Sequence, residues 1–168
     1  MSQPTHPPAT PRLDLLPLRP EHADEMAGVL SDPALHTFIG GAPDSPEALR
    51  ARYERLAAGS PDPGVLWLNW VLRERATGSL VGTVQATVTG GTAEVAWVVG
   101  TPWQGRGYAV EAARSLVRQL VRTYPLTTVV AHVHPAHHAS ATVAAAAGLT
   151  ATDETQDGEI RWRLTVRD

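Results

Sequence analysis

The sequence predicts one α+β domain with a mixed, mostly antiparallel sheet of six or seven strands and helices on both faces. A chain of 168 residues has the length of a single domain. Three consecutive runs rich in Val, Trp and Thr, within residues 66–99, are separated only by short turns, which is typical of an antiparallel meander. From residue 107 onward, apolar residues recur at helical spacing instead.

The first third of the chain is expected to contain one strand and two helices. Pro20 suits the first turn of the first helix, and acidic residues follow it where the helix dipole favours them. Ser45 and Gly59 are typical of the N-cap and the C-cap of the second helix. The expected ranges are 13–19 for the strand, 20–30 and 46–58 for the helices, and 35–43 for the loop between them.

The rest of the chain is expected to contain the meander, two further helices and three further strands. Gly90 and Gly91 mark a short turn inside the meander, and the helical period that follows ends near Tyr124. An Ala-rich stretch that ends at Gly148 is a good helix former. The expected strands are 66–73, 79–89, 92–99 and 127–134, with two more within 149–167, and the expected helices are 108–124 and 138–147.

The composition excludes several classes of function. The net charge is −3, and the basic residues, all of them Arg, form no patch or run. This argues against nucleic acid as the main partner, because phosphate backbones are bound by clustered basic residues. The chain has no Cys, which excludes a disulfide framework, a thiolate zinc site and a cysteine nucleophile.

The N-terminal residues and the hydropathy indicate the cellular location of the protein. Residues 1–11 are rich in Pro and lack the apolar stretch of a signal peptide, so we expect a disordered tail before a single domain over residues 12–168. No apolar run approaches the roughly 18 residues that are needed to span a bilayer. We therefore expect a cytoplasmic protein without a membrane partner.

The segment Gln104–Ala109, with the sequence QGRGYA, is the most informative part of the chain. It leads from the end of a strand directly into a helix, whose N-terminus presents free backbone N–H groups that bind phosphate. Gly105 and Gly107 let the backbone approach phosphate oxygens, because they carry no Cβ. A tight connection without any ligand is the alternative. A P-loop is excluded because the chain has no Lys, and the GxGxxG dinucleotide pattern is absent.

This segment resembles the acetyl-CoA-binding motif of the GNAT N-acetyltransferase superfamily, Q/R-x-x-G-x-G/A. Gln104, Gly107 and Ala109 occupy its fixed positions, and residues 93–117 are especially similar to the branch that contains the ribosomal-protein N-terminal acetyltransferases. The order of elements matches the family over about residues 12–166. The resemblance implies an acetyl-CoA-dependent enzyme that moves an acetyl group directly to a primary amine of a small molecule, a peptide or a protein N-terminus, with no metal.

The resemblance also implies roles for individual residues. The fourth strand should splay from the fifth and expose backbone groups to the pantetheine arm, and the amides of the Gly-rich loop should hold the pyrophosphate. A family segment N-x-x-S, here His137 to Ser140 with His in place of Asn, should contact the coenzyme. The expected cofactor-binding residues are Trp97, Val98, Val99, Gln104, Gly105, Arg106, Gly107, Tyr108, Ala109, His137 and Ser140.

Acetyl transfer to an amine requires a base for the nucleophile, a donor for the developing oxyanion and a proton for the leaving thiolate. Glu94 is the candidate base, because strand alternation places it on one face with Ala96 and Val98. A carboxylate on a central strand is unfavourable unless it is solvated or paired, so a structural hydrogen bond is the alternative role. The backbone N–H of Val98 or Val99 is the candidate oxyanion donor.

The acid that is usual in the family, a Tyr four residues before the Gly that ends the next helix, is missing here because Ala144 occupies that position. Ser140 is the best substitute, as in the ribosomal branch, unless its hydroxyl only satisfies amides at the start of the helix. His137 and His138 are the reserve candidates. The candidates for the acceptor pocket are His36, Phe38, Trp67, Asn69 and Trp70, with a place in the core as the alternative for most of the aromatic residues.

Two other functions stay open from the residues alone. His132, His134, His137 and His138 have a spacing that can ligate zinc, although no Cys and no nearby carboxylate completes the site. A regulatory protein that binds coenzyme A without catalysis would keep the loop and lose turnover. The sequence does not name the acceptor, and it is compatible with a monomer or a homodimer.

Overall fold

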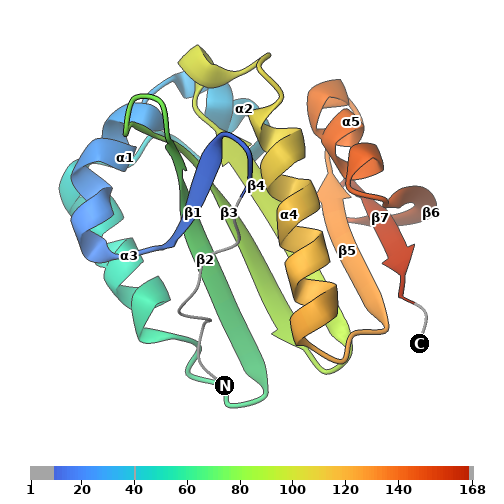
Figure 1. Ribbon diagram of the computed structural model, residues 1–168. Helices are drawn as coiled ribbons and strands as arrows, with labels where there is room; N and C mark the ends of the chain where they lie inside the picture. Colours follow the sequence, from blue (N-terminus) through green and yellow to red (C-terminus); the bar gives the residue numbers. More distant parts are fainter. Residues whose placement is uncertain (1–9, 40, 167–168) are drawn as a thin grey trace.

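The computed structural model of the protein describes residues 10–39 and 41–166. Its centre is a seven-stranded sheet with the strand order β1-β2-β3-β4-β5-β7-β6 (Figure 1). Neighbouring strands are antiparallel except β4 and β5, which are parallel. The strands are β1 (Leu13–Pro17), β2 (Val65–Glu74), β3 (Leu80–Thr89), β4 (Thr92–Val99), β5 (Thr128–Val133), β6 (Thr150–Gln156) and β7 (Glu159–Thr165).

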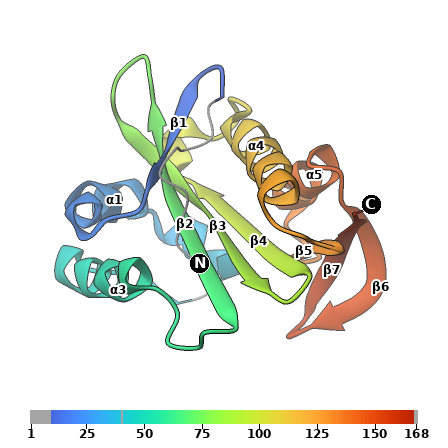
Figure 2. The ribbon, with the colours of Figure 1, turned by 60° about the horizontal axis from the view of Figure 1, so that its bottom comes forward.

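Helices cover both faces of this sheet. Figure 2 shows α1 and α3 on one face, and α4 with α5 beside it on the other. Within residues 10–39 and 41–166, no helix combines the length and the apolar character that are needed to cross a bilayer. The helices are α1 (Ala23–Val29), α2 (His36–Ile39), α3 (Pro46–Ala58), α4 (Tyr108–Thr123) and α5 (His138–Ala146), with 3-10 turns at Pro20–His22, Pro33–Leu35 and Thr101–Trp103.

Two buried clusters hold the layers together. The larger cluster lies between α4 and the sheet and includes Leu116 and Trp70. The smaller cluster lies beneath α1 and α3 and includes Met26, Tyr53 and Val71. Trp70 and Val71 are consecutive residues of β2, and successive side chains of a strand point to opposite faces. The sheet is therefore apolar on both sides, as a central layer must be.

The predicted α+β fold is confirmed, and one expected element needs correction. The segment expected as a loop over residues 35–43 is partly helical, because a 3-10 turn over Pro33–Leu35 leads into α2. Asp32 caps this turn by accepting a hydrogen bond from the amide of Ala34 at 2.9 Å. Proline suits the first position of such a turn because its φ is already fixed there. Asp32 thus begins a new helical turn shortly after the end of α1.

Most of the expected N-terminal tail, residues 1–9, lies outside the described residues. Thr10 is described, and it is buried. Its hydroxyl donates a hydrogen bond to Glu111 on α4, and the amide of Leu13 donates to the same hydroxyl oxygen at 2.9 Å. Ordered contacts with the domain therefore begin before residue 12.

Candidate functional site

β4 and β5 are parallel neighbours that separate partway along their length. Their ladder contains three residue pairs, the last of them between Glu94 and Val130. Beyond that pair, β4 continues to Val99 while paired with β3, and β5 continues to Val133 while paired with β7. Among residues 10–39 and 41–166, the edge of β4 from Val95 onward therefore has no strand partner on the β5 side. This confirms the splay that was predicted between the fourth and fifth strands.

Alternation along β4 determines which backbone groups face the opening. The N–H of Gly100 donates to the carbonyl of Val81 at 2.8 Å. Because antiparallel partners exchange hydrogen bonds at every second residue, the N–H of Val98 points toward β3. The N–H groups of Trp97 and Val99 point toward the opening instead. Of the two candidate oxyanion donors, Val99 is the one on the open side.

The loop after β4 presents free backbone donors at the start of α4. The side-chain amide of Gln104 donates to the carbonyl of Val99 at 2.9 Å and so ties the loop to the end of the strand. Within the part of the chain that the structure describes, the N–H groups of residues 105–110 have no protein acceptor, whereas that of Glu111 donates to the carbonyl of Gly107 at 3.0 Å. These free donors lie at the positive end of the helix dipole, which favours an anion.

Two glycines set the path of this loop. The φ angles are +79° at Gly105 and +82° at Gly107, in the left-handed region that residues with a Cβ disfavour. A Cβ at Gly107 would also lie 3.3 Å from Nη2 of Arg12. Close approach to phosphate is thus not the only reason for these glycines, because the backbone conformation alone favours them.

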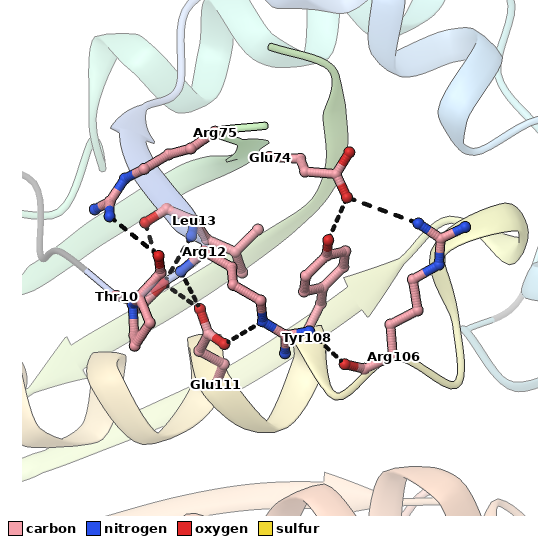
Figure 3. A network of polar contacts seen from close by, with 9 residues as sticks. Thr10, Arg12, Leu13, Glu74, Arg75, Arg106, Tyr108 and Glu111 are labelled. Atoms are coloured by element: carbon pink, nitrogen blue, oxygen red, sulfur yellow. Dashed lines mark hydrogen bonds and ion pairs between the residues drawn. The ribbon is translucent and has the colours of Figure 1, made fainter. Parts of the chain in front are cut away.

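A polar network of Arg12, Glu74, Arg106, Tyr108 and Glu111, here termed the loop anchor, supports the loop (Figure 3). Arg12 Nη1 donates to the carbonyl of Arg106 at 2.8 Å, and its Nε donates to Glu111 Oε1 at 2.9 Å. The Tyr108 hydroxyl donates to Glu74. The guanidinium of Arg12 also lies 4.5 Å from the centre of the Tyr108 ring, in cation–π contact. The loop is therefore connected to the residue just before β1 and to the end of β2.

Hydrogen bonds within the loop anchor shift the pKa values of its members. The bond from the Tyr108 hydroxyl lowers the pKa of Glu74 and raises the pKa of Tyr108 itself. Burial acts to raise the pKa of Glu111, but hydrogen bonds from Thr10 and Arg12 outweigh burial, so the pKa is lowered. At neutral pH both carboxylates are ionised and Tyr108 is a protonated donor, which gives Tyr108 a structural task.

A cavity of about 500 Å³ lies among the open edge of β4, the loop and the first turns of α5. Its volume falls in the range of about 300–1,000 Å³ that is typical of ligand pockets. Arg106 does not line it, because its guanidinium is turned toward Glu74, 3.8 Å away. The expected cofactor-binding residues that do line it are Trp97, Val98, Val99, Gln104, Gly105, Gly107, Tyr108, Ala109, His137 and Ser140.

Ser140 and Trp97 connect the two sides of the opening. The indole Nε1 of Trp97 donates to the Ser140 hydroxyl oxygen at 3.0 Å. Ser140 accepts this bond and keeps its own proton available for a second partner. Ala144, at the usual Tyr position, is fully buried. Burial and the nearby His134 lower the pKa of His137, which makes it a weaker reserve acid at neutral pH.

Glu94 and Ser140 line a second cavity of about 330 Å³. The Glu94 side chain is 47% exposed, and its Oε1 lies 3.2 Å from Nδ1 of His132. Nε2 of His132 accepts a hydrogen bond from Nε of Arg161 at 3.3 Å. The structure thus brings the two candidate catalytic residues to one cavity, where Glu94 contacts His132 and His132 in turn contacts Arg161. Sequence reasoning missed this arrangement because only the pairing of β4, β5 and β7 brings Glu94, His132 and Arg161 together.

A third cavity, of about 280 Å³, lies between the sheet and the layer of α1 and α3. His36 and Asn69, two of the acceptor-pocket candidates, line it. Trp70 does not, because it is 1% exposed in the cluster beneath α4, on the opposite face of the sheet. Trp67 is not among the described residues that line this cavity. The side chain of Phe38 lies outside the described residues.

His132 of β5 and His134, just after β5, have partners other than a metal ion. Among the residues that the structure describes, no group of three or more His, Cys, Asp or Glu side chains is placed to hold a metal ion. His132 contacts Glu94 and Arg161, and Nδ1 of His134 accepts from the amide of Ala136 at 3.0 Å. The expectation that no carboxylate lies near these histidines is wrong, because sheet pairing brings Glu94 to His132.

Comparison with known proteins places this arrangement in a family. The model of the acetyltransferase (GNAT) domain family matches residues 12–150. An acetyltransferase from Agrobacterium tumefaciens str. C58 is 26% identical, with a TM-score of 0.77 over 99% of this chain and 96% of that one. No curated protein sequence gave a match.

Two further solved structures share the fold at lower identity. RimL, a ribosomal L7/L12 alpha-N-protein acetyltransferase in complex with coenzyme A, is 14% identical, with a TM-score of 0.77 over 96% of this chain and 97% of that one. The aminoglycoside acetyltransferase AAC(6')-Ib, in complex with coenzyme A and kanamycin, is 16% identical, with a TM-score of 0.72 over 91% of this chain and 94% of that one. Together with the family match, the loop motif and the parted strands, these likenesses identify the protein as an acyltransferase that belongs to the GNAT acetyltransferase family.

Proposed function

We propose that the protein transfers the acetyl group of acetyl-CoA directly to a primary amine of a small molecule, a peptide or a protein N-terminus. The observation that carries this proposal is the opening between β4 and β5, where free donors of a strand edge and of a helix N-terminus border one cavity of about 500 Å³. The complexes of RimL and AAC(6')-Ib with coenzyme A support the same ligand for this chain.

The residues around this cavity fit the chemistry of the coenzyme. A pyrophosphate needs several hydrogen-bond donors, and the free N–H groups of residues 105–110 supply them without any Lys. The pantetheine arm carries amide groups, which can pair with the open edge of β4 at Trp97, as an added strand would, and this leaves the N–H of Val99 for the acyl oxygen. Bound acetyl-CoA supplies an activated acyl carbon as a thioester.

In the proposed reaction the amine nitrogen bonds to the acyl carbon as the carbon–sulfur bond breaks. Glu94 accepts the proton that the amine loses, directly or through water. The N–H of Val99 donates to the carbonyl oxygen while negative charge builds on it. Ser140 donates its proton to the departing sulfur and regains one from solvent. Trp97 supports this last step, because its indole donates to Ser140 and leaves the hydroxyl proton free.

We infer that the acceptor is a compact amine that is cationic in solution. Carboxylates of Glu94, Asp157 and Glu159 line the cavity of about 330 Å³ and would attract an ammonium group. The neighbouring cavity of about 280 Å³ has an apolar wall that includes Leu30 and Leu49. The two cavities adjoin at Gln85, Ala96 and Trp97, so one acceptor can reach both. An ammonium must lose a proton before it attacks, which explains a carboxylate at this place.

Coenzyme binding is tested by changing the charge at the start of α4. Ala109 lines the cavity of about 500 Å³ in the first turn, where an acidic side chain stabilises a helix. We expect Ala109→Glu to weaken acetyl-CoA binding about tenfold or more by charge repulsion, roughly 1.4 kcal/mol. The matched variant Ala109→Gln should lose less, and calorimetry measures both. Equal affinity of a folded Ala109→Glu variant and the parent would place the coenzyme elsewhere.

Catalysis is tested by the release of free thiol from acetyl-CoA with a panel of amines. The panel contrasts polyamines, amino-acid amides and anionic amines at equal concentration. We expect turnover, with cationic amines as the better substrates. Tight binding of acetyl-CoA without turnover of any amine would instead indicate a regulatory protein that binds the coenzyme.

A further inference from the structure

His132 links the candidate base to a fixed positive charge. It lies on β5 and is paired directly with Arg161 of β7 in the ladder, while Glu94 of β4 is paired with Val130, two residues earlier on β5. Glu94 and Arg161 therefore approach the imidazole from opposite sides. The His132 side chain is only 11% exposed, so its surroundings hold it in place.

The two contacts determine where the imidazole carries its proton. Arg161 has only N–H donors, so the Nε2 atom that faces it at 3.3 Å must accept with its lone pair. A neutral imidazole that accepts at Nε2 carries its proton on Nδ1. Nδ1 lies 3.2 Å from Glu94 Oε1, and so it donates to the carboxylate. The chain of donors runs from Arg161 through His132 to Glu94.

We propose that His132 is a positioning residue for Glu94, held by Arg161 as the neutral tautomer with its proton on Nδ1. The proposal rests on the proposed acetyl transfer with Glu94 as the base. His132 holds Oε1, which leaves Oε2 free to take the proton from the acceptor amine. His132 is itself excluded as the base, because Arg161 occupies its lone pair.

The contact with Arg161 has a second consequence, because Nε2 of His132 cannot carry a proton while it accepts from the guanidinium. An imidazolium next to Glu94 would form an ion pair with the carboxylate and weaken it as a base. With Arg161 present, both ring nitrogens already have partners that suit the neutral form. Other titratable and charged groups line the cavity on the elements around His132. They are Glu94 of β4, His134 after β5, His137 before α5, Asp157 of the β6–β7 turn and Glu159 of β7. Arg161 lies at the ring itself.

Removal of Arg161 gives a direct test in the pH–rate profile. In Arg161→Leu, Nε2 of His132 loses its donor and can take a proton from solvent in acid, and the neighbouring carboxylate favours the charged ring. The base is then ion-paired at low pH, so activity is lost at a higher pH than in the parent. We expect the acidic midpoint of kcat to move upward by about one pH unit. Arg163→Leu is the matched control, since Arg163 lies two residues further along β7 and pairs with Glu154 instead.

A second substitution separates titration from shape. Gln at position 132 offers one amide donor and one acceptor but cannot protonate. We expect the double variant His132→Gln/Arg161→Leu to return the acidic midpoint to that of the parent. His132→Leu removes the contact with Glu94 and should lower kcat about tenfold, at the low end of general-base effects, with the KM for acetyl-CoA unchanged. A merely structural role for His132 would not move the midpoint.

The tautomer can also be measured without any turnover. Nitrogen-15 NMR of protein labelled at its 7 histidines, assigned with His132→Gln, should show Nδ1 protonated and Nε2 bare at neutral pH. A proton on Nε2 in the parent would overturn the proposal. An acidic midpoint of kcat that does not move in Arg161→Leu would also overturn it, and so would an unchanged kcat in His132→Leu. These results would leave acetyl transfer intact, because thiol release by the parent tests that separately.

Discussion

The proposed coenzyme side and the proposed acceptor side of this site are built from different chemical groups. On the coenzyme side, the donors are backbone N–H groups of residues 105–110, and the loop anchor supports them. On the acceptor side, the candidate groups for proton transfer and positioning are side chains of Glu94, His132 and Ser140, from three separate elements. Backbone donors survive most side-chain changes that preserve the path of the chain. The acceptor side, in contrast, should respond to the exchange of a single atom.

The largest expected effect is on the acceptor side, with Glu94→Gln. This exchange keeps the shape of the side chain and removes the base, so kcat should fall about 10²–10⁴-fold. Glu94 does not line the cavity of about 500 Å³, so the affinity for acetyl-CoA should stay unchanged. Steady-state thiol release and calorimetry on the same preparation measure the two quantities. A pH–rate profile that overlays that of the parent would remove Glu94 from the reaction.

Ser140→Ala comes next and probes the junction of the two sides. Loss of the hydroxyl should slow turnover about ten- to a hundredfold, because a thiolate is a fairly good leaving group and depends less on an acid. Trp97→Phe is the control, since it removes the indole donor and keeps the hydroxyl. If turnover falls by the same factor in both variants, the contact between Trp97 and Ser140 is what matters, and not the proton of the Ser140 hydroxyl.

A smaller effect is expected on the coenzyme side, with Glu111→Gln. Arg12 and Glu111 are partly exposed, so the weakened contacts should lower stability by about 1 kcal/mol. The affinity for acetyl-CoA should fall a few-fold, while kcat at saturation stays the same. These values come from thermal unfolding, calorimetry and thiol release.

The same variant has a defined pH dependence. The folded-state pKa of Glu111 is lowered from 4.5, so its stabilisation is fully present above that value and is lost as pH falls through the folded pKa. The difference in Tm between parent and Glu111→Gln should therefore be largest near neutral pH and shrink in acid. A difference that grows in acid would contradict the network.

The smallest effect is expected for His137→Asn, which restores the family residue at the start of α5. Both side chains can donate one hydrogen bond, so the affinity for acetyl-CoA should change by less than about 1 kcal/mol. Burial lowers the pKa of His137, so the imidazole is neutral at the pH of the assay and the pH–rate profile should keep its shape. If the fall in rate at high pH disappeared from the pH–rate profile of His137→Asn, His137 would instead be identified as the acid.

The sequence predicted the path of the loop from β4 into α4 well because its signals are local. Gln104–Ala109 is a continuous segment, and the pattern of Gly residues follows from left-handed backbone at Gly105 and Gly107. The helix over residues 46–58 was likewise predictable, since Ser45 caps it by accepting from Ala48 at 3.1 Å. Caps and turns depend on neighbours in the chain, and these are visible in one sequence.

The acceptor side was less predictable because it depends on sheet pairing. His132 suggested a metal ligand, and nothing near it in the sequence pointed to Glu94 or Arg161. Trp70 was one candidate for the acceptor pocket with the core as its alternative, and its position in the alternation of β2 directs it into the core beneath α4. Strand order and register decide such contacts, and neither follows from local patterns.

Trp97 has a practical consequence for anyone who studies binding to this protein. Trp97 borders all three of these cavities and its indole bridges to α5, so it is a built-in optical reporter. Indole emission responds to the polarity around the ring and to hydrogen bonding at Nε1. Coenzyme and acceptor should therefore each leave a distinct fluorescence change. Subtraction of the signal of Trp97→Phe isolates that reporter from the other 4 of the 5 tryptophans, and unlabelled protein then suffices to screen ligands by light alone.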